Sequence, residues 1–246
     1  MGKLPIPMEK IRKDVFLIHG VGKKLGSDYY DKFVAGIRSF IPIDEDVNFH
    51  PVDYSPLLDE KEEKIFSWMK GMGYQGLRKF GCDFLADVLA YSPPENPAKA
   101  GDFYFDVNEM LSKKFEAVEK SYPQSKKIII SHSLGTQIAF SFAWKKEIDV
   151  LFTCGSPIIY FAVRFSGFGK FPEATLKRMI NFYNENDPVA TIIGRNPALK
   201  KCQDIKVKSW NPRYLLPLQA HSFYFVSADV QKKIAEVLSE NVDGKK

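Results

Sequence analysis

Short apolar runs alternate with amphipathic stretches along most of this 246-residue chain, and this alternation restricts its fold more than any other feature. Runs such as Val15–His19 and Ile128–Ile130 are almost continuously apolar, as expected for strands buried on both faces of a parallel sheet. The stretches between such runs carry apolar residues at helical spacing. The sequence therefore predicts an α/β fold, a mostly parallel six-stranded sheet with helices on both faces.

The candidate strands are, in chain order, residues 15–19, 47–52, 127–131, 150–153, 179–183 and 204–210. Helices are expected from Ser27 or Asp28 up to Pro42, from Asp106 to Pro123, over 134–145 and after Ser227. The segment 57–105, after the second strand, is too long for a simple crossover. We predict a helical insertion there, either a cap over a pocket or additional core. Because we find no repeats or low-complexity linkers, residues 1–246 are predicted to form one domain.

The charge balance argues against a nucleic-acid-binding protein. The chain has 35 Lys and Arg against 30 Asp and Glu, a formal net charge of +5, which is mild for that class. One basic cluster is interpreted as a solvated face, with an anionic substrate or peripheral contact with a membrane as the alternative; it comprises Arg195, Lys200, Lys201, Lys206, Lys208 and Arg213. No apolar run approaches the length of a membrane span, so no transmembrane segment is predicted.

The cysteines and the amino-terminal residues indicate a cytoplasmic location. Cys82, Cys154 and Cys202 are far apart and lack C-x-x-C spacing, so neither a disulfide framework nor a zinc site is predicted. A reducing compartment fits this usage, and Met1–Lys13 lacks the apolar stretch of a signal peptide. The sequence carries no signal for a particular oligomeric state.

Two glycine-rich stretches match nucleotide-binding loops in spacing only. Gly71-Met-Gly-Tyr-Gln-Gly76 has the spacing of a dinucleotide fingerprint, but the residues before it look helical rather than strand-like. Gly20-Val-Gly-Lys-Lys-Leu-Gly26 follows a strand, but Ser27 stands where a phosphate loop needs lysine. Neither stretch predicts a cofactor site.

The junction Ile128-Ile-Ile-Ser-His-Ser-Leu-Gly135 is the strongest local signal for chemistry. A buried strand, a tight turn and a helix form a nucleophile elbow, which exposes a serine hydroxyl on a strained turn. The residues two before and two after the nucleophile must be small, and around Ser133 they are Ser131 and Gly135. Ser131 is the competing nucleophile, but it still belongs to the strand, so Ser133 is assigned.

A general base and an acid follow Ser133 in the chain. His221 is the only histidine after Ser133, so a catalytic base at this site must be His221. Asp187 lies just beyond a predicted strand, and its carboxylate would accept the imidazole Nδ1–H and hold the productive tautomer. Glu185, on the same loop, and Asp204 are the alternative acids.

The loop His19-Gly-Val-Gly22 follows the first strand, at the sheet edge where the other candidate residues gather. The backbone N–H groups of Val21 and Leu134 can together form an oxyanion hole for a tetrahedral intermediate. The two glycines of the loop allow its backbone to approach closely.

Taken together, these segments resemble the lipase and esterase members of the α/β-hydrolase superfamily. The matching segments are Leu17–Gly20, Ser131–Gly135, Thr153–Pro157, Asn184–Val189 and Ala220–Tyr224. The resemblance implies a sheet of order 2-1-3-4-5-6 and acyl transfer through an acyl-enzyme on Ser133, without a metal or cofactor.

The substrate class follows less directly from the residues. The aromatic-rich segments 65–84 and 158–171 suggest a lipophilic acyl group, although the same rings can simply close the core. We expect hydrolysis of carboxylic esters of a small-molecule or lipid acyl substrate. An acyltransferase or thioesterase with the same triad, and a non-catalytic binding protein of this fold, are the alternatives.

Overall fold

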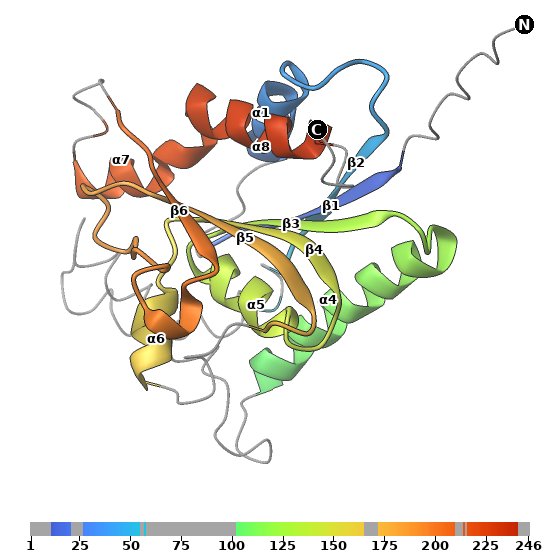
Figure 1. Cartoon of the computed structure of the whole chain (residues 1–246), viewed down its shortest axis with the longest axis horizontal. Coiled ribbons are helices and arrows are strands. Elements are labelled where there is room, and N and C mark those ends of the chain that lie inside the picture. The colour runs from blue at the N-terminus through green and yellow to red at the C-terminus, as the bar shows by residue number, and fades with distance from the viewer. Residues whose placement is uncertain are drawn as a thin grey trace, which may run out of the picture.

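The computed structural model describes residues 11–20, 27–54, 57, 102–164, 172–209, 214 and 216–240. The described strands, β1 (Lys13–Ile18), β2 (Val47–Val52), β3 (Lys126–His132), β4 (Ile148–Cys154), β5 (Leu176–Tyr183) and β6 (Cys202–Lys206), form one sheet. All neighbouring pairs are parallel, and the order is β2-β1-β3-β4-β5-β6 (Figure 1). The predicted six-stranded parallel sheet and its predicted order are confirmed.

Helices cover both faces of this sheet. The helices in the described part of the chain are α1 (Ser27–Arg38), α4 (Asp102–Ser121), α5 (Leu134–Phe142), α6 (Ile158–Arg164), α7 (Pro217–Ser222) and α8 (Ala228–Ser239), with 3-10 turns η3 (Pro197–Leu199) and η5 (Phe223–Phe225). Helices α1 and α8 lie side by side over one face, and α4 and α5 lie over the other (Figure 1). In the described part of the chain, no helix is long and apolar enough to cross a membrane.

The core is divided by the sheet into two apolar layers. Along β1, Phe16 packs with the α4–α5 layer, and Val15 and Leu17 pack with the α1–α8 layer. Successive side chains of a strand point to opposite faces, so a strand buried on both faces must be apolar throughout. The near-continuous apolar run at β1 therefore has a direct structural cause.

Two element boundaries differ from the sequence prediction. Helix α4 begins at Asp102 rather than at Asp106, because buried Tyr104 extends the apolar face formed by Val107 and Leu111. The predicted insertion 57–105 therefore contributes its last residues to α4; apart from Leu57, its other residues lie outside the described part of the chain.

The last strand also differs, running over Cys202–Lys206 rather than over 204–210. Cys202 pairs with Met179 in the ladder and buries its side chain, so the strand starts earlier than its polar sequence indicates.

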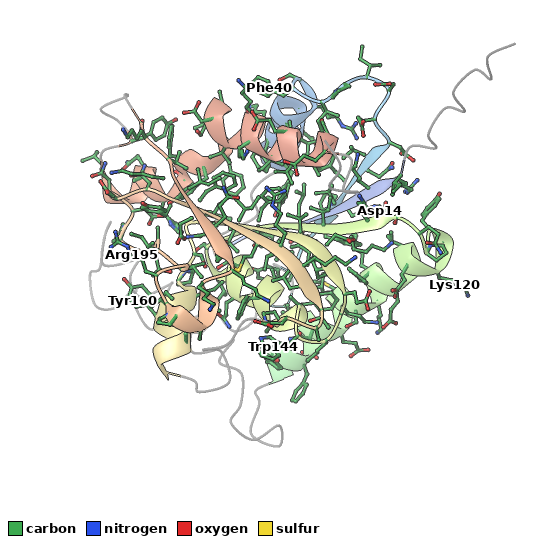
Figure 2. The ribbon with its side chains drawn as sticks, viewed as in Figure 1. Asp14, Phe40, Lys120, Trp144, Tyr160 and Arg195 are labelled. Atoms are coloured by element: carbon green, nitrogen blue, oxygen red, sulfur yellow. The ribbon has the colours of Figure 1, made fainter. Side chains whose placement is uncertain are left out.

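A buried ionic cluster surrounds Asp14 near the amino end of β1 (Figure 2). Its carboxylate accepts hydrogen bonds from Arg12 (2.9 Å), Ser125 (2.5 Å) and His50 Nε2 (2.8 Å). Burial alone raises the pKa of Asp14, but these donors together hold that pKa below its ordinary value. The cluster joins β1, β2 and the turn before β3, at the end of the sheet opposite to the nucleophile elbow.

Candidate active site

Ser133 occupies the turn between β3 and α5 with φ 53° and ψ −128°, and it is the one non-glycine residue of positive φ in the described ranges. A backbone conformation of this kind costs on the order of 1–3 kcal/mol and persists only where neighbouring contacts impose it. Here the Ser133 N–H donates to the Cys154 carbonyl (3.0 Å), and the Ser133 carbonyl accepts from Thr136 Oγ1 (2.7 Å). This strand–turn–helix geometry is the one that the sequence predicts.

Two glycines let the neighbouring backbone reach the elbow. A Cβ on Gly135 would overlap the His19 carbonyl oxygen and lie 2.6 Å from that of Ile18, so the first turn of α5 packs directly on the end of β1. A Cβ on Gly20 would lie 2.5 Å from Ser133 Cβ. The chain leaving β1 therefore passes beside Ser133, where an oxyanion loop is needed.

The structure describes one of the two predicted oxyanion donors, Leu134. Leu134 is the first residue of α5, where backbone N–H groups lack partners within the helix and the helix dipole favours negative charge. Val21 lies outside the described residues.

The two candidate nucleophiles have different environments. Ser131 lies within β3, and its buried hydroxyl donates to the Phe152 carbonyl at 2.8 Å. Ser133 Oγ is also buried, and it has no hydrogen-bond partner among the residues described. The hydroxyl of Ser131 is therefore committed to the sheet, and that of Ser133 is available for chemistry.

His221 and Asp187 form a buried pair. His221 Nδ1 lies 2.9 Å from Asp187 Oδ2 and 3.0 Å from Oδ1. A carboxylate oxygen only accepts, so Nδ1 carries the hydrogen, and in the neutral ring Nε2 then carries the lone pair. Asp187 follows β5, as predicted. His221 was expected in a loop and instead lies in the last turn of the short helix α7.

Two further donors fix the Asp187 carboxylate. The Val189 N–H donates to Oδ1 at 2.9 Å, and the Tyr224 hydroxyl donates to Oδ2 at 2.8 Å. Burial alone raises the pKa of Asp187, but the hydrogen bonds from His221, Val189 and Tyr224 together hold that pKa below its ordinary value. The carboxylate is therefore ionised at neutral pH although it is buried.

The alternative acids point elsewhere. Glu185 forms a surface ion pair with Lys206 at 2.5 Å. Asp204 lies within β6 and accepts the N–H groups of Ile193 (2.9 Å) and Gly194 (2.7 Å). Of the three acids considered, Asp187 is the one that contacts His221.

The elbow and the pair share one corner of the molecule, at the carboxyl ends of β3, β4 and β5. His132, adjacent to Ser133 in the chain, donates from Nε2 to the His221 carbonyl at 2.7 Å. Gly155, at the end of β4, has φ 59°, and a Cβ there would lie 2.9 Å from Asp187 Oδ2 and 3.1 Å from His221 Cε1. The fold thus pairs His221 with Asp187 and places His132, the residue before Ser133, against the His221 main chain.

Sequence reasoning assigned no role to His132, Gly155 and Tyr224. Tyr224 follows His221 by three residues, a helical spacing that places both on one face and offers a signal for its contact with Asp187. The contact between His132 and His221 joins residues 89 apart in sequence, and no local pattern indicates it.

The sheet order, the elbow after β3 and the acid after β5 are those of an α/β-hydrolase fold. No protein-family model matches the chain, and neither does any curated protein.

Among solved structures, the proteins to which the chain is similar include a serine hydrolase homologue, an esterase and a cutinase. An α/β serine hydrolase homologue from Coxiella burnetii has 12% identity and a TM-score of 0.49, over 96% of this chain and 88% of that one. A cold-adapted esterase from an Arctic intertidal metagenomic library has 9% identity, a TM-score of 0.46, and coverage of 89% and 84%. A Trichoderma reesei cutinase has 12% identity, a TM-score of 0.40, and coverage of 93% and 77%. The fold assignment rests on the topology and the elbow rather than on these similarities.

Proposed function

We propose that this protein is a serine hydrolase that cleaves carboxylic esters through an acyl-enzyme on Ser133. One observation carries the proposal: a buried carboxylate holds His221 Nδ1 at 2.9 Å, and the His221 main chain bonds to His132, which directly precedes the strained serine of a nucleophile elbow. A strained serine or a His–Asp pair alone has structural explanations. The two together, at one corner of a parallel sheet, favour nucleophilic catalysis.

In the first half of the reaction, His221 Nε2 takes the proton of Ser133 Oγ as that oxygen attacks the ester carbonyl. The backbone N–H groups of Leu134 and Val21 stabilise the oxyanion of the tetrahedral intermediate. The carbon–oxygen bond to the alcohol then breaks, the alcohol takes the proton from His221, and the acyl group stays on Ser133. In the second half, His221 deprotonates a water molecule, which attacks the acyl-enzyme. The carbon–oxygen bond to Ser133 then breaks, Ser133 Oγ takes the proton from His221, and the free acid is released.

The electrostatics support this cycle. His221 becomes an imidazolium in each half, and the ionised Asp187 carboxylate stabilises that charge without taking the proton. Burial raises the pKa of Asp187, but the hydrogen bonds from His221, Val189 N–H and Tyr224 Oη hold that pKa below its ordinary value and keep the carboxylate ionised. The acid is therefore fixed in both charge and orientation before substrate binds.

The substrate class is part of the same proposal. A lipophilic acyl group is supported by the aromatic share of segment 158–171, in which α6 presents Tyr160 with more than half of its surface exposed (Figure 2). A series of p-nitrophenyl esters with increasing acyl length tests this class, and chromatography of the products distinguishes free acid from transfer to an added alcohol.

Asp187→Asn, with Glu185→Gln as its matched control, tests the triad itself. The account predicts that Asp187→Asn lowers kcat by about 10⁴-fold, because the amide favours the wrong imidazole tautomer. Glu185→Gln changes only an exposed ion pair and should leave kcat within about twofold. Full activity in folded Asp187→Asn protein, or no ester turnover by the wild type, would overturn the proposal.

A further inference from the structure

The histidine directly before the elbow serine has a contact that the catalytic cycle above does not use. His132 is buried at the end of β3, and its Nε2 lies 2.7 Å from the main-chain oxygen of His221. A carbonyl oxygen only accepts, so Nε2 carries the hydrogen and donates it. The two imidazole rings also touch, with their centroids 4.6 Å apart and their planes at 38°.

The carbonyl that accepts this hydrogen bond lies in α7, a short helix. Helix α7 has only six residues, too few to be stable without tertiary contacts. Its last four carbonyls have no partner four residues ahead within the helix, and that of His221 is one of them. His132 therefore satisfies a helix-end carbonyl from a distant strand and ties α7 to the sheet.

The hydrogen bond between His132 and His221 begins directly beside the nucleophile elbow. His132 and Ser133 are consecutive residues, so a single hydrogen bond links the chain that carries the serine to the backbone of His221. The ring of His132 is itself held, packing edge-on against Phe225 at 4.6 Å between centroids. A displacement of α7 relative to the elbow therefore has to break the His132–His221 bond.

The His132 donor is uncharged at neutral pH. Burial, followed by the nearness of His221, lowers the pKa of His132 to about 3. The ring is thus neutral near pH 7 and adds no positive charge beside His221 when His221 becomes an imidazolium.

We propose that His132 is a positioning residue that holds the His221 main chain, and with it the imidazole, in register with Ser133. This inference rests on the proposed function for its kinetic consequence, although the contact itself can be tested without turnover. The tie should affect kcat much more than KM, because it orients the base and does not touch substrate.

Two substitutions separate the hydrogen bond from the packing. His132→Phe keeps a buried ring and removes the donor, whereas His132→Gln keeps an N–H donor of similar reach. His50→Gln is the control, because it alters a histidine bound to Asp14 at the opposite end of the sheet. We expect His132→Phe to lower kcat by about 10²-fold with KM within about threefold, and His132→Gln to recover most of that loss.

The second readout is the His221 Nδ1–H proton, followed by NMR in protein labelled with ¹⁵N-histidine. His132→Phe should accelerate exchange of this proton with water by at least about 10-fold, while His132→Gln and His50→Gln keep the wild-type rate. If His132→Phe accelerates this exchange but the wild type turns over no ester, the positioning role is supported and the proposed function is overturned. Wild-type exchange and wild-type kcat in folded His132→Phe protein, or equal losses in the Phe and Gln variants, would overturn the inference.

Discussion

Tyr224 donates its phenol hydrogen to Asp187 Oδ2 at 2.8 Å, and the same carboxylate oxygen lies 2.9 Å from His221 Nδ1. The Tyr224 oxygen also accepts the backbone N–H of Asn184 at 3.0 Å. One hydroxyl therefore joins the start of the acid loop to the carboxylate oxygen that His221 also contacts.

Tyr224→Phe should destabilise the protein at neutral pH. The substitution removes a donor to a charged group and orphans the Asn184 N–H, at a cost of about 1–3 kcal/mol. The folded-state pKa of Asp187 lies below its unfolded value of about 3.9, so this stabilisation is present above that value and disappears as pH falls through the folded pKa. Urea unfolding at a series of pH values measures it. Tyr160→Phe, an exposed tyrosine on α6, should have no effect.

One result for Tyr224→Phe would contradict the role assigned to its hydroxyl at Asp187. A loss of stability that stays the same from pH 7 to acid pH would show that the hydroxyl acts through its bond with the Asn184 N–H and not through the ionised Asp187 carboxylate.

Gly135→Ala should prevent correct folding of the elbow. The added Cβ would meet backbone carbonyl oxygens at the end of β1, which cannot move without breaking the sheet. Gly36→Ala in α1 is the matched control, because the atoms nearest to its Cβ are at the end of the Gln231 side chain, 2.5–2.6 Å away, which can rotate aside at the loss of one hydrogen bond to the Phe225 carbonyl. Soluble yield and thermal unfolding compare the two. Equal stability of both variants would contradict the close packing of α5 on β1.

The buried His132 predicts a pH dependence of stability. Its folded pKa, about 3, lies below the unfolded value of about 6.5, so the unfolded state binds more protons between these values. The contribution of neutral His132 to the free energy of unfolding is fully present above about pH 6.5. It is lost as pH falls, and the free energy of unfolding then decreases by up to about 1.4 kcal/mol per pH unit. His132→Phe should flatten the profile of unfolding free energy between pH 6.5 and pH 4. An unchanged slope would show that His132 titrates normally.

Gln137→Met should stabilise the protein by about 1 kcal/mol. Gln137 is fully buried in α5, and neither atom of its amide group has a hydrogen-bond partner in the part of the chain described. Asn181→Leu is the contrasting control, since that buried amide bonds to Thr153, Thr191 and Asp204. It should cost about 1–3 kcal/mol for each partner left unsatisfied. A fall in the urea midpoint of Gln137→Met would contradict this interpretation of Gln137.

Much of the fold could be predicted from sequence because buried parallel strands are apolar on both faces. The sheet order and the elbow at Ser133 follow from that pattern and the resemblance it supports. The start of β6 could not be found in this way, because an edge strand that carries Asp204 lacks the apolar signal. The choice among Asp187, Glu185 and Asp204 also needed the structure, because it depends on which carboxylate points at His221.

Covalent labelling with a fluorophosphonate tests the central claim most directly, since the reagent reacts with an activated serine and needs no knowledge of the natural substrate. The labelled residue is located by mass spectrometry in the wild type, in Ser133→Ala and in the control Ser131→Ala, whose hydroxyl is bound to the Phe152 carbonyl. The account predicts labelling on Ser133 in the wild type and in Ser131→Ala, and none in Ser133→Ala. Labelling of another residue, or no labelling of the folded wild type, would contradict it.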